Sequence, residues 1–312
     1  MKVLVTGSSG LVGRAFQWIT QTMNDINDTY IFLTSKDADL TREDDVRKIF
    51  EKHQPDAVVH IAANVGGLFK NMNCKSQMYE DNILMNTFVL KYARLFYVKK
   101  VVMLLSTCVF PDGKQVTEDM LHNGPPHPSN EGYAYSKRMM EVHARILHTQ
   151  HAIQTICLTP TNIYGPFDNF DLQNAHVVPA LIYKCYLAKK ENKPFVICGS
   201  GKPLRQFIYS FDMANIIHAV LQDHKVSTGH YICAPPSKES EITIDAVARL
   251  IAKEMDYEHA ITYDTSYSDG QYKKTVEPHP LIEDLPFTSM EKGLKTTIQW
   301  FMDNIDKGIV RI

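Results

Sequence analysis

The stretch "KVLVTGSSGLVG" (residues 2–13) decides the fold of this chain. Four apolar or small residues read as a strand, and Gly7, Gly10 and Gly13 follow at the spacing GxxGxxG before a helical pattern begins. Glycines here permit a tight turn and let backbone N–H groups approach a pyrophosphate at the start of the helix. The same pattern also fits an ordinary strand–helix turn, but its context favours dinucleotide binding.

Outward from this turn, short apolar runs alternate with helical patterns. Strands are expected at 2–7, 30–35, 57–63, 101–107 and 154–160, and helices at 10–23, 41–53, 79–96 and 133–151, with Thr41 as the cap of the second helix. Continuous apolar strands separated by helices predict a parallel sheet covered on both faces. The fold class expected is therefore α/β, with a Rossmann-type doubly wound parallel sheet.

After residue 165 the pattern loosens, and proline, glycine and asparagine mark turns in "YGPFDNFDLQNAHVVP" (164–179). A further strand is expected at 194–201, and helices at 210–223 and 289–306. These elements predict a smaller C-terminal α/β part that binds the substrate. The expected division gives residues 1–165, rejoined by about 194–225, to the nucleotide domain, and 166–193 with 226–312 to the substrate-binding part.

Composition excludes several classes of protein. The 312 residues contain 33 Lys plus Arg and 35 Asp plus Glu, so the net charge of −2 gives no basic excess for nucleic acid. The six cysteines lie at 74, 108, 157, 185, 198 and 233 without a CxxC pair, which predicts no metal site. No segment reads as a signal peptide or a membrane span. A cytoplasmic protein with reduced thiols and a small-molecule partner is expected.

The end of the second expected strand, "FLTSKDADL" (32–40), bears on the choice of cofactor. An NAD site usually has an acidic residue near this point, which holds the ribose 2′-hydroxyl. Here Ser35 and Lys36 come before Asp37. A lysine beside a hydroxyl favours the 2′-phosphate of NADP, unless Lys36 is only a solvated loop residue.

The segment "YAYSK" (133–137) places Tyr133 and Lys137 four residues apart, on one face of a helix. A free tyrosine has a pKa of about 10. A nearby ammonium stabilises the phenolate, so the pKa of Tyr133 is expected to fall. Such a pair can pass a proton to or from a carbonyl oxygen while a nicotinamide supplies hydride.

Together with Ser106 in "LLSTCVFP" (104–111), these elements resemble the extended short-chain dehydrogenase/reductase family. The resemblance implies that Tyr133 is the acid–base, that Lys137 holds the nicotinamide ribose, and that Ser106 hydrogen-bonds the substrate oxygen. Tyr135 is out of register with Lys137. Dehydratases of this family carry an acid pair where this chain has Cys108 and Val109, so elimination of water is not expected.

A thiol at position 108 suits removal of a proton beside a ketone, because its reference pKa of about 8.5 lies nearer neutrality than that of tyrosine. His176 in "NAHVVPALIYK" (174–184) is a candidate acid for the opposite face of the sugar. The alternatives stay open at this point: free cysteines are mostly core residues, and His176 is one of 13 histidines.

Longer motifs narrow the resemblance to the branch that converts GDP-4-keto-6-deoxy-mannose to GDP-L-fucose with NADPH by 3,5-epimerisation and 4-reduction. They are "STCVFP", "HNGPPHPSNEGYAYSKR", "PTNIYGPFDNF", "HVVPALI", "LRQFIYSFDMA", "NVGGLFKN" and "SDGQYKK". This branch is typically dimeric through helices corresponding to 79–96 and 133–151. The alternatives are another NADP-dependent reductase or epimerase of nucleotide-4-ketosugars and a non-catalytic NADP-binding regulatory protein.

The resemblance also implies which residues line the site. It implies that Ser106, Cys108, Asn162, Lys184, Cys198, Arg205, Asp269 and Lys274 contact the substrate. For NADP(H) it implies Gly7, Ser8, Ser9, Gly10, Leu11, Val12, Gly13, Lys36, Asp39, Leu40, Ala62, Ala63, Tyr133, Lys137, Pro160, Asn162, Ile163 and His176. Two positions depart from the pattern: the branch often has tryptophan at Cys198, and its bacterial members have arginine at Lys184.

Overall fold

The structure is a computed structural model of the chain. It describes residues 1–23, 28–111, 116–236, 240–258, 261–267, 269 and 272–312. The main sheet is parallel, with the strand order β10-β5-β4-β3-β1-β2. Its strands are β1 (Lys2–Thr6), β2 (Thr29–Leu33), β3 (Ala57–His60), β4 (Lys100–Leu104), β5 (Gln154–Pro160) and β10 (Gly229–Cys233).

The direction of winding reverses between β1 and β3. From β1 the chain goes outward to β2 on one side, whereas β3, β4 and β5 follow one another on the other side. Val3 pairs with Tyr30 of β2 and with Ala57 of β3, so β1 lies between them. In an open α/β sheet, ligands bind at the carboxyl ends of the strands at such a reversal. The turn after β1 therefore lies where a dinucleotide is expected.

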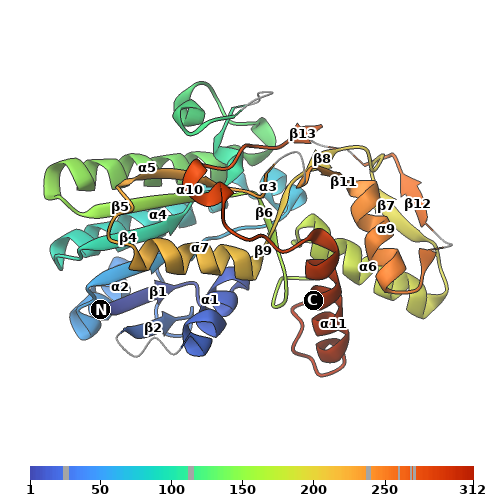
Figure 1. The fold of residues 1–312 in the computed structure, drawn as a ribbon, viewed down its shortest axis with the longest axis horizontal. Coiled ribbons are helices and arrows are strands. Elements are labelled where there is room, and N and C mark those ends of the chain that lie inside the picture. The colour runs from blue at the N-terminus through green and yellow to red at the C-terminus, as the bar shows by residue number, and fades with distance from the viewer. Residues whose placement is uncertain (24–27, 112–115, 237–239, 259–260, 268, 270–271) are drawn as a thin grey trace.

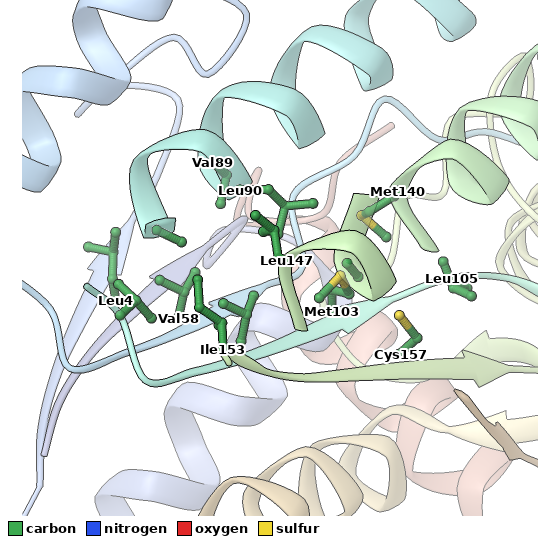
Figure 2. Close-up of a cluster of buried hydrophobic side chains, with 14 of the residues drawn as sticks. Leu4, Val58, Val89, Leu90, Met103, Leu105, Met140, Leu147, Ile153 and Cys157 are labelled. Atoms are coloured by element: carbon green, nitrogen blue, oxygen red, sulfur yellow. The ribbon is translucent and has the colours of Figure 1, made fainter. Parts of the chain in front are cut away.

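Helices cover both faces of this sheet (Figure 1). One face packs against α2, α4 and α5, and the other against α1 and α7. Figure 2 shows part of the first interface, where Val89 and Leu90 of α4 and Met140 and Leu147 of α5 meet strand residues such as Val58. The bounds are α1 (Leu11–Thr22), α2 (Glu43–His53), α4 (Lys75–Leu95), α5 (Glu131–His151) and α7 (Ser210–Gln222).

Three further helices and several short strands, mostly from the C-terminal half of the chain, form a second, smaller core (Figure 1). In it β7 pairs in parallel with β12, and β8 lies between β11 and β13. The helices are α6 (Val177–Glu191), α9 (Ile244–Glu254) and α11 (Met290–Ile305), and the strands β7 (Phe195–Cys198), β8 (Leu204–Arg205), β11 (Ile242–Thr243), β12 (Ile261–Asp264) and β13 (Lys273–Lys274).

Two short strands, β6 and β9, pair in parallel and contribute residues to both cores. Other short elements, such as the 3-10 turn η1 after β4, pack into the main core. Their bounds are β6 (Asn162–Tyr164), β9 (Phe207–Tyr209), α3 (Leu68–Asn73), α10 (Pro280–Glu283), η1 (Thr107–Val109), η2 (Glu118–His122) and η3 (Pro128–Asn130).

The predicted fold class is confirmed, and the expected strands and helices of the first 160 residues are all present. Two details differ. The helix predicted at 41–53 begins at Glu43 with Arg42 as its N-cap and no side-chain cap, because Thr41 belongs to the preceding turn, where its amide and hydroxyl donate to Asp39. The sixth strand, β10, was not predicted. The division into domains stays a prediction. β7 lies in the range expected to rejoin the nucleotide domain but packs with the second core, and β10 lies in the range expected for the substrate-binding part but completes the main sheet.

Candidate active site

Glycines shape the turn that follows β1. Gly7 has a φ of +74°, and a Cβ there would lie 2.6 Å from the amide nitrogen of Ala62. A Cβ on Gly13 would lie 2.5 Å from the Cα of Ser8. Gly10 is the N-cap of α1 and supplies no side-chain cap for the first N–H groups of this helix. A Cβ at Gly7 or Gly13 would strike backbone atoms and force the turn apart, so the glycines keep the turn tight in front of the helix N-terminus, an arrangement that fits a pyrophosphate.

The other residues of the turn differ in burial. Ser8 is buried, and its hydroxyl donates to the carbonyl oxygen of Leu33 at 2.7 Å. Its side chain therefore ties the turn to the end of β2. Val12 is also buried, Leu11 is partly buried, and Ser9 is exposed. The roles of these four residues in cofactor binding stay predictions.

The segment after β2 presents a lysine to solvent. Asp37 accepts hydrogen bonds from the amide and hydroxyl of Thr34 at 2.8 and 2.7 Å, and these bonds hold the pKa of the Asp37 carboxyl below its usual range. Asp39 likewise accepts hydrogen bonds from the amide and hydroxyl of Thr41. Lys36 comes directly before Asp37 and is exposed, whereas Leu40 packs against the core. The acid that an NAD site would offer is thus already hydrogen-bonded within its own turn.

The predicted catalytic residues Ser106 and Cys108 lie on η1, directly beyond β4. The hydroxyl oxygen of Ser106 accepts a long hydrogen bond from the Cys108 amide at 3.4 Å, and the Val109 amide donates to the Ser106 carbonyl at 3.0 Å. Cys108 is buried and packs with Tyr133, Met78 and Ala134 in a small apolar cluster. The structure therefore brings the thiol of η1 against the tyrosine of α5.

Tyr133 and Lys137 lie on the first turns of α5. Gly132 lets this end of the helix approach α4, because a Cβ at Gly132 would overlap the carbonyl oxygen of Lys75. The ammonium nitrogen of Lys137 lies 5.7 Å from the centre of the Tyr133 ring and donates to the carbonyl oxygen of Leu104 at 2.7 Å. Ser106, Cys108, Tyr133 and Lys137 thus form one group at the carboxyl end of β4.

The expected lowering of the Tyr133 pKa is wrong for this structure. Burial raises the pKa of the Tyr133 phenol, and the nearby Cys108 adds to the rise. Burial also lowers the pKa of Lys137 to about 8, against opposing contributions from Cys108 and Cys157. Burial outweighs the nearby ammonium because both Tyr133 and Lys137 are almost completely removed from solvent. Tyr133 consequently stays protonated at neutral pH, as a proton donor must be.

A buried hydrogen-bonded chain that the motifs did not indicate supports this group. His60 contacts the Thr6 hydroxyl at 2.8 Å and the Asn86 side-chain oxygen at 3.0 Å, and the Asn86 amide donates to the Ser136 carbonyl at 3.4 Å. Burial lowers the pKa of His60 to about 4, so the imidazole is neutral at physiological pH. The chain links β1 and β3 to the helix turn that carries Lys137.

His176 is the N-cap of α6, and its carbonyl accepts the Ala180 amide at 3.0 Å. The loop 64–71 reaches the residues just before it. The Gly67 amide donates to the Asn174 carbonyl at 2.9 Å, and a Cβ at Gly67 would overlap the Ala175 carbonyl oxygen. This glycine contact fixes the start of α6 against the nucleotide-binding part of the chain.

The predicted substrate residues of the second core form two groups. The ammonium of Lys184 donates to the sulfur of Cys198 at 2.9 Å, so the two departures from the family pattern lie in direct contact. Arg205 is partly buried, and burial lowers its pKa against the opposing charge of Asp269. Asp269 accepts the Ser200 amide at 2.6 Å. Lys274 lies in β13, and its side chain falls outside the described part of the structure.

Asn162 at the start of β6 is held by a residue that the motifs did not single out. Its side-chain amide donates to the Gln206 carbonyl at 2.9 Å. Gln206 is fully buried, and its own side chain bonds the Val276 amide at 2.7 Å and the Val276 carbonyl at 3.0 Å. Pro160 ends β5, and Ile163 packs against the main core. The signal available in the sequence is an uncharged amide directly before the apolar strand residues 207–209.

Among the described residues, no group of three or more His, Cys, Asp or Glu side chains is arranged to hold a metal ion. Within the same part of the chain, no helix has the length and apolar character needed to cross a membrane.

Fold and site together define a Rossmann-type enzyme of the epimerase and reductase class. The family model described as "NAD dependent epimerase/dehydratase family" matches residues 3–234. The "GDP-L-fucose synthase" of Dictyostelium discoideum is 45% identical over 309 residues, which cover 97% of this chain and 96% of that protein. The "Probable GDP-L-fucose synthase" of Drosophila melanogaster is 39% identical over 318 residues, covering 98% of each chain.

A solved structure of a GDP-L-fucose synthetase from Naegleria fowleri, bound to NADP, has a TM-score of 0.92 and 39% identity, and it covers 100% of this chain and 95% of that one. The chain therefore belongs to the NAD dependent epimerase/dehydratase family and, within it, to the GDP-L-fucose synthases.

Proposed function

We propose that the chain is a bifunctional NADPH-dependent 3,5-epimerase and 4-reductase, which converts GDP-4-keto-6-deoxy-D-mannose to GDP-L-fucose. The observation that carries the proposal is the packing of Cys108 against Tyr133, with Lys137 one helical turn further along α5. A reductase alone needs the tyrosine and the lysine. A thiol beside them adds a group that can remove a proton from a carbon next to the ketone.

Inversion at carbons 3 and 5 uses the acidity that the C4 ketone gives to their hydrogens. Cys108, as the thiolate, removes one proton, and the electrons move onto the ketone oxygen to give an enolate. Ser106 and Tyr133 hydrogen-bond this oxygen, and His176 returns a proton to the opposite face of the same carbon. The thiol and the imidazole then exchange protons with solvent, so each inverted carbon carries a solvent hydrogen. Repeating the cycle at the other carbon completes the epimerisation.

Bound NADPH supplies a hydride to carbon 4. Tyr133 gives the matching proton to the C4 oxygen, which its raised pKa permits because the phenol is protonated before the reaction. Lys137 stabilises the phenolate that results and holds the nicotinamide ribose. A single pocket serves all three steps because each of them develops negative charge on the same oxygen.

Cationic side chains of the second core support binding of the GDP diphosphate. Lys184 and Arg205 both lie in this core, on α6 and β8. We assign Cys198, Asp269 and Lys274 to the sugar side of the site, together with Asn162. For the cofactor we assign the glycine turn, and we assign Lys36 to the 2′-phosphate because it is exposed beside acids that are already bonded.

The proposal extends to assembly and location. Exposed apolar side chains lie on both helices of the expected dimer interface: Leu84 and Leu95 on α4, and Met139 and Ile146 on α5. A homodimer through α4 and α5 would bury them. All six cysteines are free, which agrees with a reducing compartment such as the cytoplasm.

The variant Cys108→Ser tests the proposal. In deuterium oxide without NADPH, the wild-type enzyme should incorporate solvent deuterium at carbons 3 and 5 of the ketosugar, and the variant should not. With NADPH, the variant should still oxidise the cofactor and yield an unepimerised GDP-6-deoxyhexose. Normal GDP-L-fucose output from the variant would show that Cys108 is a buried core residue and does not remove the protons. Absence of NADPH oxidation by the wild type would support a non-catalytic NADP-binding protein instead.

A further inference from the structure

Arg138 follows Lys137 on α5, and its guanidinium lies inside the protein. Only 4% of the residue is exposed. Its Nε donates to the carbonyl oxygen of Val109 at 2.6 Å, and its Nη1 donates to the carbonyl oxygen of Gly124 at 2.7 Å. The guanidinium carbon also lies 5.5 Å from the centre of the Tyr135 ring. Arg138 therefore joins α5 to the turn that bears Cys108.

Burying this charge is costly. Burial lowers the pKa of Arg138, and the third nitrogen, Nη2, is buried without a hydrogen-bond partner. Buried donors in proteins are nearly always paired, so an unpaired one points to a constraint on the position of the side chain. The two bonds to carbonyl oxygens supply that constraint, because they hold the guanidinium between Val109 of η1 and Gly124, which follows η2.

The backbone of η1 makes few hydrogen bonds of its own. The described ones are from Val109 to the Ser106 carbonyl, from Phe110 to the Thr107 carbonyl at 3.4 Å, and from the Cys108 amide to the Ser106 hydroxyl at 3.4 Å. The side chains of η1 are otherwise held by apolar packing. The helix that holds it, by contrast, is firmly packed: Met140 and Leu147 of α5 sit in the buried cluster with Met103 and Cys157 (Figure 2). A bond from this helix to Val109 therefore fixes the turn on a rigid support.

We propose that Arg138 is a positioning residue, which holds the Cys108 thiol at a fixed place relative to Tyr133. Tyr133 lies five residues earlier on the same helix, so one rigid element sets the positions of both groups. This inference rests on the proposed function, in which Cys108 removes the protons. Arg138 then acts on the inversions through Cys108, whereas Tyr133, Lys137 and hydride transfer do not depend on it.

The test compares Arg138→Met with Arg138→Lys and with Arg145→Met as a matched control. Arg145 is an exposed arginine of the same helix, paired with Glu141 at 3.5 Å. Deuterium incorporation at carbons 3 and 5 without NADPH measures inversion. Oxidation of NADPH and the sugar composition of the product measure reduction.

In Arg138→Met, inversion should fall by about 10²-fold, since a displacement of about 1 Å at a reacting group costs that much. NADPH oxidation should stay within about threefold of wild type, and unepimerised product should accumulate. Arg138→Lys should recover part of the inversion rate, because an ammonium can still donate to one carbonyl. Arg145→Met should behave as wild type in both measurements.

An equal fall of inversion and reduction in Arg138→Met would mean a general structural role and would overturn the inference, as would no fall at all. If Arg138→Met does not fold, Arg138→Lys decides, since a selective loss of inversion is expected there too. Failure of the proposed function has a different signature: the wild-type enzyme itself would incorporate no deuterium.

Discussion

The ammonium of Lys137 donates to the carbonyl oxygen of Leu104 at 2.7 Å, which ties α5 to the last residue of β4. This bond fixes a cation in a fully buried place, one helical turn from Tyr133. Because both residues are buried, their protonation is governed by desolvation more than by their mutual attraction.

The pH dependence of reduction should report this lysine. With a pKa lowered to about 8, Lys137 is charged below that pH and neutral above it. The neutral amine no longer stabilises the phenolate left when Tyr133 gives up its proton. We expect kcat/KM for ketosugar reduction to fall as the pH rises through about 8, measured by NADPH oxidation in the wild-type enzyme. In Cys108→Ser the fall should come at a lower pH, because the opposing contribution of Cys108 is lost. Lys137→Met should reduce the ketosugar slowly at every pH, and its kcat/KM should show no such fall as the pH rises. If kcat/KM does not fall up to about pH 9.5 in the enzyme that retains Lys137, the assignment of this pH dependence to Lys137 is contradicted.

Replacing Tyr133 by phenylalanine removes the proton donor and leaves Cys108 in place. Reduction should slow by about 10²–10⁴-fold, the usual contribution of a positioned acid. Deuterium incorporation at carbons 3 and 5 should persist, because Cys108 and His176 carry it. Tyr135→Phe, on the same helix, is the matched control and should retain reduction. Equal effects of the two substitutions on reduction would show that Tyr133 is not the proton donor.

Two glycines of the first turn should differ sharply in their tolerance of alanine. At Gly7 a Cβ would strike the Ala62 amide and the backbone has a positive φ, so Gly7→Ala should destabilise the fold by about 1–3 kcal/mol. At Gly10 the φ is −80° and a Cβ would approach only the Gly7 carbonyl, at 3.3 Å.

Thermal unfolding with and without NADPH measures the effect of each substitution. The rise in Tm caused by NADPH should be lost in Gly7→Ala, since the pyrophosphate cradle is deformed, and should be largely kept in Gly10→Ala. Equal behaviour of the two variants would show that the close approach of the turn to Ala62 does not matter.

Asp168 makes stability depend on pH. Burial raises the pKa of its carboxyl to about 7, against the nearby charge of Arg311, and its Oδ2 is buried without a hydrogen-bond partner. An unfolded aspartate has a pKa of about 3.9. Between these two values the folded state holds a proton that the unfolded state releases, so the free energy of unfolding falls as the pH rises.

Asp168→Asn should remove this dependence and raise the stability at pH 8 by roughly 1–3 kcal/mol, with little effect at pH 4. Urea unfolding at several pH values checks it. Asp306→Asn, at the exposed C-cap of α11, serves as the control and should leave the free energy of unfolding unchanged at both pH 4 and pH 8. A variant that is no more stable than wild type at pH 8 would refute the assignment.

Much of the fold was predictable because the strands of the main sheet are buried on both faces and read as continuous apolar runs. Helix α5 was expected at 133–151 and occupies Glu131–His151. β10 is not apparent in the sequence because "GHYIC" follows a polar loop and begins with glycine and histidine instead of a continuous apolar run; its pairing with β5 identifies it. Thr41 fits a cap in the sequence, which does not show the bonds from Thr41 back to Asp39.

The grouping of Ser106, Tyr133 and Lys137 followed from motif spacing, whereas Arg138 and Gln206 could not be found that way. Their partners are backbone groups far along the chain, such as Val109 for Arg138 and Val276 for Gln206. Periodicity carries no information about side-chain bonds of this kind. The direction of the Tyr133 pKa shift depended on burial, which only the packing around η1 reveals.

The place of β10 has a consequence for synthesis of the protein. The fifth strand of the main sheet ends at Pro160 and the sixth begins at Gly229, so the chain between them, with α6, β7 and α7, must leave the ribosome before the sheet is complete. A nascent chain that stops short of residue 233 exposes the edge of β5. The main sheet is therefore completed after α6 and β7 of the second core have been made but before α9 and α11, so synthesis of the two cores overlaps along the chain.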